Sequence, residues 1–329
     1  MAGCAAPSVY RPSVRPAKPA MSASHAIMDD GYQLPFTLWE PRGESRAVIL
    51  ALHGMNDYSN AFASFGGYMS ERGITVLAYD QRGFGRTEGA GRWHGRERLV
   101  RDLRIMAALL RERFTGQALY LLGASMGGAV ILASQRAEPP DADGVILVAP
   151  AVWSRDSMPF YQRWALWLVA HTFPDMELSG EGLDITPSDN VEMLRALVRD
   201  PLVIKGARAD VVYGVANLMD DAARAAANLH RNALILYGAN DEIIPREPSC
   251  RLFARLPNGP RRSWQGVVYD KGYHMLLRDL QAQRVWQDIA DWVLAPGRWT
   301  AVAAGRPGRT APERFCGPAP EFVRLVTSL

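Results

Sequence analysis

The sequence predicts an α/β protein with a mostly parallel sheet flanked by helices. Short apolar runs, typical of strands buried on both faces, alternate with longer segments of helical spacing. This alternation implies right-handed crossovers between parallel strands. The apolar runs are residues 47–52, 74–79, 118–122, 145–150, 233–237 and 264–269.

Changes in this rhythm divide the 329 residues into a core, a cap and two tails. The core comprises residues 26–150 and 230–295. Residues 151–229 have no convincing strand pattern and are broken by prolines, so they predict a helical cap inserted over the core. Residues 1–25 are rich in Pro, Ala and Ser and predict a flexible leader, and residues 296–329 predict a mostly mobile tail.

Composition excludes several classes of protein. The 48% of hydrophobic and 22% of charged residues are ordinary for a soluble globular chain. The formal net charge is +3, with no basic patch interleaved with aromatics, so we expect no nucleic-acid partner. No apolar run reaches the ~18 residues of a membrane span. Cys4, Cys250 and Cys316 lie far apart without metal-ligand spacing, which predicts neither a metal site nor a disulfide framework.

The segment around Cys4 gives the leader a second interpretation. Ala2-Gly3-Cys4-Ala5-Ala6 resembles the cleavage and lipidation site of a bacterial lipoprotein, although the apolar segment that precedes such a site is absent. Either Cys4 carries a lipid anchor and the protein lies in the bacterial cell envelope, or Cys4 is a chance cysteine of a cytoplasmic protein.

The core begins with a hairpin and two buried strands. A turn at Asp30-Gly31 separates partly alternating runs within residues 26–40, which predicts an antiparallel hairpin at a sheet edge. The first buried strand ends at His53, which we interpret as a brace for the following loop. The second ends in Asp80-Gln81-Arg82-Gly83-Phe84-Gly85, which lacks the third glycine and the Lys-Ser/Thr of phosphate loops, so this loop is predicted to be structural.

The strongest chemical signal follows the third apolar run. Gly123-Ala124-Ser125-Met126-Gly127 fits Gly-x-Ser-x-Gly between a strand and a helix, which is the context of a nucleophile elbow. A side chain at Gly123 or Gly127 would collide with the neighbouring strand or helix. The turn exposes the Ser125 hydroxyl, and the N–H of Met126 points toward a developing oxyanion. Ser125 is therefore the candidate nucleophile.

An acid and a histidine follow in the order that this chemistry needs. Asp241 lies 116 residues after Ser125 (241 − 125), and His274 lies 33 residues after Asp241 (274 − 241), each just past a sheet strand. His274 is the candidate base for the Ser125 proton, and Asp241 is the candidate acid that orients the imidazole. The competing acids, adjacent to Asp241 or on the histidine's own loop, are Glu242, Asp270 and Asp279.

The first part of the cap is the most aromatic stretch of the chain. The candidate substrate-binding residues there are Trp153, Phe160, Tyr161 and Trp164. Their aromatic face fits either an acyl pocket or contact with a membrane surface. The alternative is that these side chains pack the cap onto the core.

Residues 26–294 carry a joint pattern of five features. They are His53-Gly54-Met55, Tyr79-Asp80-Gln81-Arg82-Gly83-Phe84-Gly85, Gly123-Ala124-Ser125-Met126-Gly127-Gly128, Asp241 and Gly272-Tyr273-His274. The pattern resembles the monoacylglycerol lipase / lysophospholipase group of α/β hydrolases, also described as serine aminopeptidase S33-like. The resemblance implies an α/β-hydrolase fold, a triad of Ser125, Asp241 and His274, and an oxyanion hole made by the N–H groups of Met55 and Met126.

The resemblance also implies a small lipid ester substrate, a monoacylglycerol or lysophospholipid cleaved through an acyl-enzyme, with no cofactor and no metal. The chain departs from the pattern at Ala124, where relatives often carry histidine, and at Met55-Asn56-Asp57, which replaces a small residue followed by Gly-Glu/Asp-His. These departures leave acyl length and headgroup preference open.

Two other functions remain open from the sequence. One is a general short-chain carboxylesterase. The other is an S33-type aminopeptidase, which needs an acidic cap residue to hold the substrate amine, and the candidates are Asp175, Glu177, Glu181 and Asp184. Peripheral membrane contact, through the cap or a lipid on Cys4, is a further expectation. Ser125 at the elbow excludes the dehalogenases and epoxide hydrolases that use an aspartate nucleophile.

Overall fold

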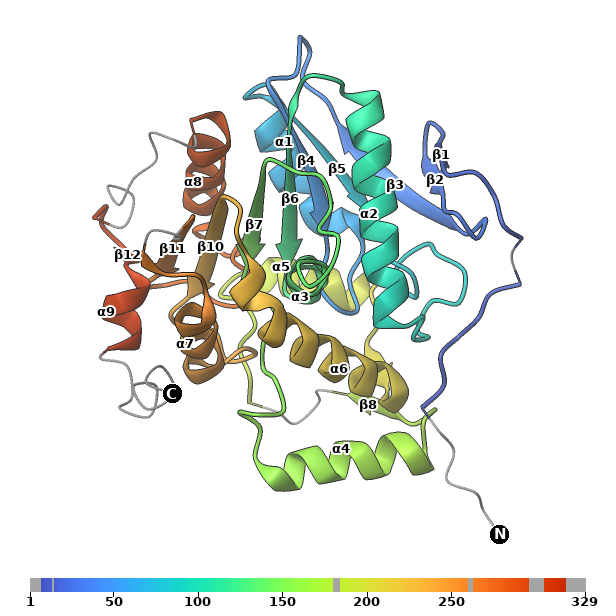
Figure 1. Cartoon of the computed structure of the whole chain (residues 1–329). Coiled ribbons are helices and arrows are strands. Elements are labelled where there is room, and N and C mark those ends of the chain that lie inside the picture. The colour runs from blue at the N-terminus through green and yellow to red at the C-terminus, as the bar shows by residue number, and fades with distance from the viewer. Residues whose placement is uncertain (1–6, 14, 180–183, 260–262, 296–304, 318–329) are drawn as a thin grey trace.

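The computed structural model describes residues 7–13, 15–179, 184–259, 263–295 and 305–317. Its centre is a block of parallel strands: β4 (Ala47–Leu52), β5 (Ile74–Tyr79), β6 (Ala118–Ala124), β7 (Gly144–Val148), β10 (Ala233–Gly238) and β11 (Trp264–Tyr269). Antiparallel strands extend both edges: β1 (Ala20–Met21), β2 (His25–Ile27), β3 (Gln33–Trp39) and β12 (Arg309–Thr310). The order β1-β2-β3-β5-β4-β6-β7-β10-β11-β12 confirms a mostly parallel sheet (Figure 1).

Alternate side chains of each central strand enter two separate cores. On β4, Val48, Leu50 and Leu52 join one apolar cluster, whereas Ala47, Ile49 and Ala51 join the other. Helices α2 (Arg96–Arg113), α3 (Met126–Ser134), α6 (Ala209–Ala225) and α7 (Arg246–Arg255) cover the first face. Helices α1 (Ala63–Ser70) and α8 (Ala282–Leu294) cover the second. Burial on both faces explains why these strands are apolar at almost every position, with Thr75 and Gln265 as polar exceptions.

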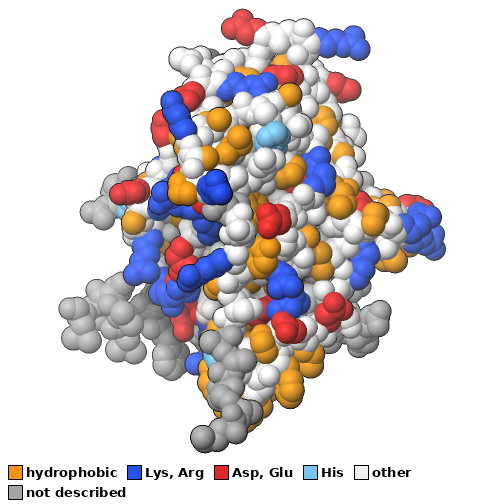
Figure 2. Space-filling model, turned by 90° about the vertical axis from the view of Figure 1, so that its right-hand side faces the viewer, with side chains coloured by type: hydrophobic (Ala, Val, Ile, Leu, Met, Phe, Trp, Pro, Cys, Tyr) orange, Lys and Arg blue, Asp and Glu red, His pale blue; other side chains and the backbone are white. Residues whose placement is uncertain are grey.

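The hairpin and the loop after β5 form as the sequence predicts. β2 pairs antiparallel with β3, and Gly31 at the turn has a φ of +82°, which favours glycine. Arg82, 2% exposed, donates to the carboxylates of Asp30 and Asp102 and so ties this loop to the hairpin and to α2. Positive and negative side chains are interspersed on the side of the molecule where β1 and β2 lie (Figure 2).

The leader differs from the expectation of a flexible segment. Residues 7–13 and 15–24 lie along the core, where the Tyr10 N–H donates to the Trp93 carbonyl (2.7 Å) and the Ser8 hydroxyl to Asp210 (2.8 Å). The Tyr10 ring also meets the His94 ring edge-on, with centroids 5.0 Å apart. Composition does not reveal such partners, because they come from distant parts of the chain. Cys4 lies outside the described residues.

Part of the C-terminal tail is also held by the core. β12 adds to the sheet edge, and Arg309 makes a two-pronged ion pair with Asp288, at 2.6 and 2.9 Å. A disulfide joins Cys250 of α7 to Cys316 of α9 (Pro312–Cys316), across a sequence separation of 66 residues. The expectation that the cysteines form no disulfide framework is wrong for this pair, because the chain returns to α7 after α8. Residues 296–304 and 318–329 lie outside the description.

The segment between β7 and β10 divides into an exposed part and a core part. α4 (Phe160–Thr172), α5 (Val191–Arg199) and the short ribbon of β8 (Glu177–Ser179) and β9 (Gly206–Arg208) lie outside the sheet layers. By contrast, α6 packs against α3. Core packing therefore resumes at α6, before the expected cap boundary at residue 229.

In the described ranges, no helix combines the length and apolar character needed to cross a bilayer. Across the same ranges, no cluster of three or more His, Cys, Asp or Glu side chains suits a metal ion.

Candidate active site

Ser125 sits on a strained turn between β6 and α3. Its φ of 49° and ψ of −114° are unusual for a residue with a side chain. A Cβ on Gly123 would lie 2.5 Å from the Gly127 carbonyl, and a Cβ on Gly127 would lie 2.2 Å from the Leu52 carbonyl oxygen. The collisions expected at these glycines are thus present, and the tight turn has the geometry of a nucleophile elbow.

Asp241 and His274 form a buried pair beside this turn. His274 Nδ1 donates to Asp241 Oδ2 at 2.8 Å, and the two side chains are 8% and 3% exposed. Asp241 Oδ1 accepts the N–H groups of Ile243 and Ile244, both at 2.9 Å, which fixes the plane of the carboxylate. With its proton on Nδ1, the imidazole keeps a free lone pair on Nε2.

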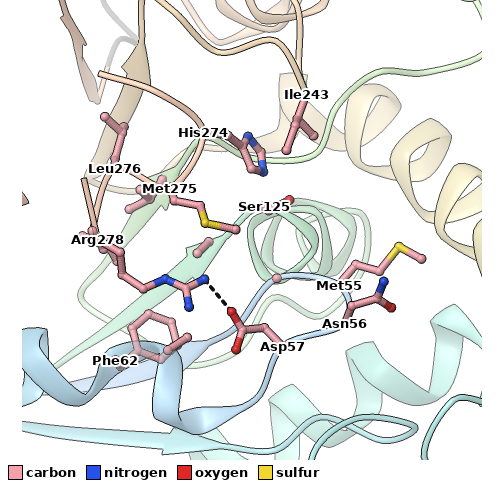
Figure 3. A pocket seen from close by; sticks show the side chains of 15 residues that line it. Met55, Asn56, Asp57, Phe62, Ser125, Ile243, His274, Met275, Leu276 and Arg278 are labelled. Atoms are coloured by element: carbon pink, nitrogen blue, oxygen red, sulfur yellow. Dashed lines mark hydrogen bonds and ion pairs between the residues drawn. The ribbon is translucent and has the colours of Figure 1, made fainter. Parts of the chain in front are cut away.

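Ser125 and His274 line the same cavity (Figure 3). No hydrogen bond joins the Ser125 hydroxyl to the imidazole among the residues that the structure describes, which is common in unliganded sites. The three competing acids have other partners. Glu242 accepts from the Thr186 N–H, Asp270 from the Thr310 hydroxyl, and Asp279 from Ser188 and the Tyr273 N–H.

The loop after β4 passes directly against the elbow. A Cβ on Gly54 would lie 3.3 Å from Ser125 Cβ, so the Gly54-Met55 segment borders the hydroxyl from one side, while Met126 begins α3 on the other. Both backbones adjoin the place where the oxygen of a bound carbonyl would become negative.

His53 braces this loop, as its position predicted. Its Nε2 accepts the Gln81 N–H at 2.9 Å, so Nδ1 carries the proton and donates to the Gly54 carbonyl at 2.8 Å. The side chain is fully buried, and burial lowers the pKa of His53 below its usual value. A neutral imidazole therefore links the loops that follow β4 and β5.

The structure does not bring the four aromatic candidates to the cavity. Phe160, Tyr161 and Trp164 are 81%, 60% and 63% exposed on α4, and Trp153 packs partly buried against the core. The apolar lining comes instead from side chains next to the motifs: Met55, Ala61, Phe62, Ala124, Val148, Ile243, Met275, Leu276 and Leu277. Its polar members besides Ser125 and His274 are Asn56, Asp57 and Arg278.

The cavity holds about 240 Å³ and has an ion pair in its wall. Arg278 donates to Asp57 from a position 221 residues away in the chain (Figure 3). Sequence reasoning missed this lining. The run Met275-Leu276-Leu277-Arg278, directly after the candidate base, was the available signal, because residues that flank a catalytic group commonly border its substrate.

The sequence of the chain matches a known protein family. The family model described as serine aminopeptidase, S33, matches residues 43–281, most of the chain. The chain belongs to this family. It is an enzyme, a serine hydrolase of the α/β-hydrolase fold.

Individual relatives agree with this assignment. The chain is 24% identical over 268 residues to a monoacylglycerol lipase of Mycolicibacterium smegmatis, covering 80% of this chain and 94% of the relative. It is 24% identical over 288 residues to human monoglyceride lipase, covering 84% and 91%. A soluble variant of the Saccharomyces cerevisiae monoglyceride lipase superposes with a TM-score of 0.69 at 19% identity, over 88% of this chain and 97% of the other.

Proposed function

We propose that the protein is a monoacylglycerol lipase in which Ser125, His274 and Asp241 form the catalytic triad. The observation that carries the proposal is the pair of Asp241 and His274 facing the strained Ser125 turn across one largely apolar cavity. Relatives named monoacylglycerol or monoglyceride lipase support the choice of substrate.

In the first half of the reaction, His274 Nε2 takes the Ser125 proton as Oγ attacks the ester carbonyl carbon. The N–H groups of Met55 and Met126 stabilise the oxyanion that forms. The imidazolium, stabilised by Asp241, then gives its proton to the glycerol oxygen as the C–O bond breaks. Glycerol leaves, and the acyl chain remains on Ser125.

In the second half, water takes the place of glycerol. His274 accepts a proton from the water as it attacks the acyl carbonyl, and returns this proton to Ser125 Oγ when the bond to the enzyme breaks. The products are a fatty acid and the free enzyme. No cofactor enters either half.

The acidic residues of the cap do not favour an aminopeptidase. Asp175 is paired with Arg208, and none of Asp175, Glu177 and Asp184 lines the cavity, while Glu181 lies outside the described residues. The carboxylate that does line the cavity, Asp57, is paired with Arg278. A substrate amine therefore meets no unpaired carboxylate among the described lining residues.

The exposed face of α4 is proposed to contact the membrane from which the substrate is taken. Phe160, Tyr161, Trp164, Trp167 and Phe173 are 44–81% exposed on or next to this helix. Aromatic side chains of this kind insert at the boundary between headgroups and acyl chains. This arrangement replaces the acyl-pocket interpretation of these residues.

A lipid on Cys4 would act at the same end of the molecule. The Ser8 hydroxyl donates a hydrogen bond to Asp210 at the start of α6. The N-terminal end of the described chain lies near β8 and the C-terminal end of α4 (Figure 1). Cys4 precedes Ser8 by four residues, which span at most ~14 Å. Mass spectrometry of the protein from its native host tests this proposal, and an unmodified Cys4 removes it.

The function is tested by hydrolysis of a panel: monoacylglycerols, lysophosphatidylcholine, short nitrophenyl esters and an aminoacyl amide. We expect monoacylglycerols to be preferred, and Ser125→Ala to lower kcat/KM by ~10³-fold or more with folding unchanged. Ser179→Ala, an exposed serine of β8, is the control and keeps full activity. Turnover retained in Ser125→Ala contradicts the nucleophile, and turnover of only short esters or the amide contradicts the lipase.

A further inference from the structure

The wall of the cavity beside the elbow carries one ion pair, Asp57 with Arg278. The side chains are 10% and 20% exposed, so both are largely withdrawn from solvent. The other described lining residues, apart from Asn56, Ser125 and His274, are apolar or glycine. In the view of Figure 3, Ser125 lies between His274 and this pair. A substrate whose ester group lies at Ser125 therefore shares this small cavity with the ion pair.

Both partners of the pair are fixed by further contacts. Asp57 Oδ1 accepts the Tyr58 N–H at 2.9 Å, and Oδ2 accepts from the Arg278 guanidinium. The Arg278 carbonyl accepts from the Asn190 side chain at 2.9 Å, and its N–H donates to the Met275 carbonyl at 2.7 Å. The two charges thus belong to the resting cavity and need no substrate to come together.

The charges of Asp57 and Arg278 sum to zero, so the charge of a headgroup affects how well it can bind beside them. A glycerol headgroup has hydroxyls that can donate to the Asp57 carboxylate and accept from the Arg278 guanidinium. It can therefore form hydrogen bonds with both side chains while their ion pair stays intact. A phosphate-bearing headgroup must compete with Asp57 for Arg278 and bring its negative charge close to the Asp57 carboxylate. Such like-charge contact is a strong element of discrimination at a poorly solvated site.

We propose that Asp57 and Arg278 determine headgroup specificity by admitting uncharged glycerol esters and rejecting esters whose headgroup carries phosphate. This inference rests on the proposed lipase function and assigns the discrimination between monoacylglycerols and phosphate-bearing single-chain esters to these two residues. Asp57 is the rejecting group, because Arg278 without it is a free guanidinium of the kind that binds phosphate.

The test compares two esters of one acyl chain, 1-dodecanoylglycerol and its 3-phosphate, below their aggregation concentrations, with a nitrophenyl ester that has no headgroup. The measured quantity is the ratio of kcat/KM for the glycerol ester to that for the phosphate ester. Asp57→Asn is expected to lower this ratio at least ~10-fold, because it frees Arg278. Arg278→Gln is expected to raise it, because Asp57 then stands unpaired.

Asp220→Asn is the matched control. Asp220 pairs with Arg155, their side chains are 14% and 20% exposed, and neither lines the cavity, so loss of this ion pair leaves the ratio unchanged. Destabilisation alone cannot move the ratio in opposite directions in Asp57→Asn and Arg278→Gln. If both variants move it the same way, or Asp57→Asn leaves it within twofold of wild type, the inference is wrong and the lipase assignment stands. If the wild type hydrolyses only the nitrophenyl ester, the lipase assignment itself is wrong and the inference falls with it.

Discussion

Helices α4 and α6 come from the same stretch of sequence, yet they lie in opposite environments. On α6 the buried side chains are mostly small or aliphatic, among them Val211, Val215 and Leu218. On α4 the aromatic side chains are exposed, and only Ala170 is buried. Small side chains let a helix approach α3 closely, whereas a row of large rings on α4 finds no matching surface on the core. The row of aromatic side chains therefore marks the exposed helix of this segment and not the packed one.

The largest effect that tests this contrast is Gly214→Ala on α6. In an exposed helix, alanine is more favourable than glycine by ~1 kcal/mol. Here a Cβ would lie 2.3 Å from Trp93 Cε2, and Trp93 is 6% exposed, so it has little room to move. We expect a loss of ~2–3 kcal/mol in the free energy of unfolding, measured by urea denaturation. Ala165→Leu on α4, at an exposed position, is the control and changes stability by less than ~0.5 kcal/mol. A Gly214→Ala variant as stable as wild type would mean that α6 is not packed so closely.

A smaller effect concerns a histidine beside Trp93. His94 is 5% exposed between the rings of Tyr10 and Tyr32, and burial, helped by the nearby Arg82, lowers the pKa of His94 to about 4. The unfolded chain takes up this proton near pH 6.5, so the stability from neutral His94 is complete above that pH and is lost as the pH falls toward 4. Between pH 7 and 5 the contribution is ~2 kcal/mol.

We expect His94→Phe to reduce the loss of stability between pH 7 and 5 by about that amount, measured by urea denaturation at each pH. His171→Phe on α4 serves as the comparison, because this histidine stacks on Trp167 outside the core. If the pH dependence of the free energy of unfolding is the same in His94→Phe as in wild type, folding does not lower the pKa of His94.

The smallest effect belongs to the exposed helix. Replacing Phe160 and Trp164 of α4 by alanine removes side chains that are 81% and 63% exposed, so the free energy of unfolding is expected to change by less than ~0.5 kcal/mol. Binding to phospholipid vesicles, measured by sedimentation, is expected to weaken ~10-fold. Hydrolysis of a soluble nitrophenyl ester stays constant, because neither residue lines the cavity. Vesicle binding equal to wild type would exclude α4 as the membrane contact.

Residues close in sequence carried most of the successful prediction. Short apolar runs predict the six parallel strands. Local turn patterns that contain glycine predict the Asp30-Gly31 hairpin and the tight turn at Ser125. The pairing of Asp241 with His274 was also foreseen, because each follows a strand of a parallel sheet and those ends meet at one edge. Catalytic roles for these residues remain a proposal.

What the sequence by itself determined is thus the sheet, the elbow and the order of the candidate triad, because periodicity and backbone constraints act over a few residues. The tertiary structure decided which surfaces meet. It alone showed the ion pair of Arg278 with Asp57, the disulfide between Cys316 and Cys250, and the ring contact of Tyr10 with His94. It also showed that the aromatic face of α4 lies outside the core. These contacts join residues tens to hundreds of positions apart, and no local pattern encodes them, because each depends on how all the layers pack together.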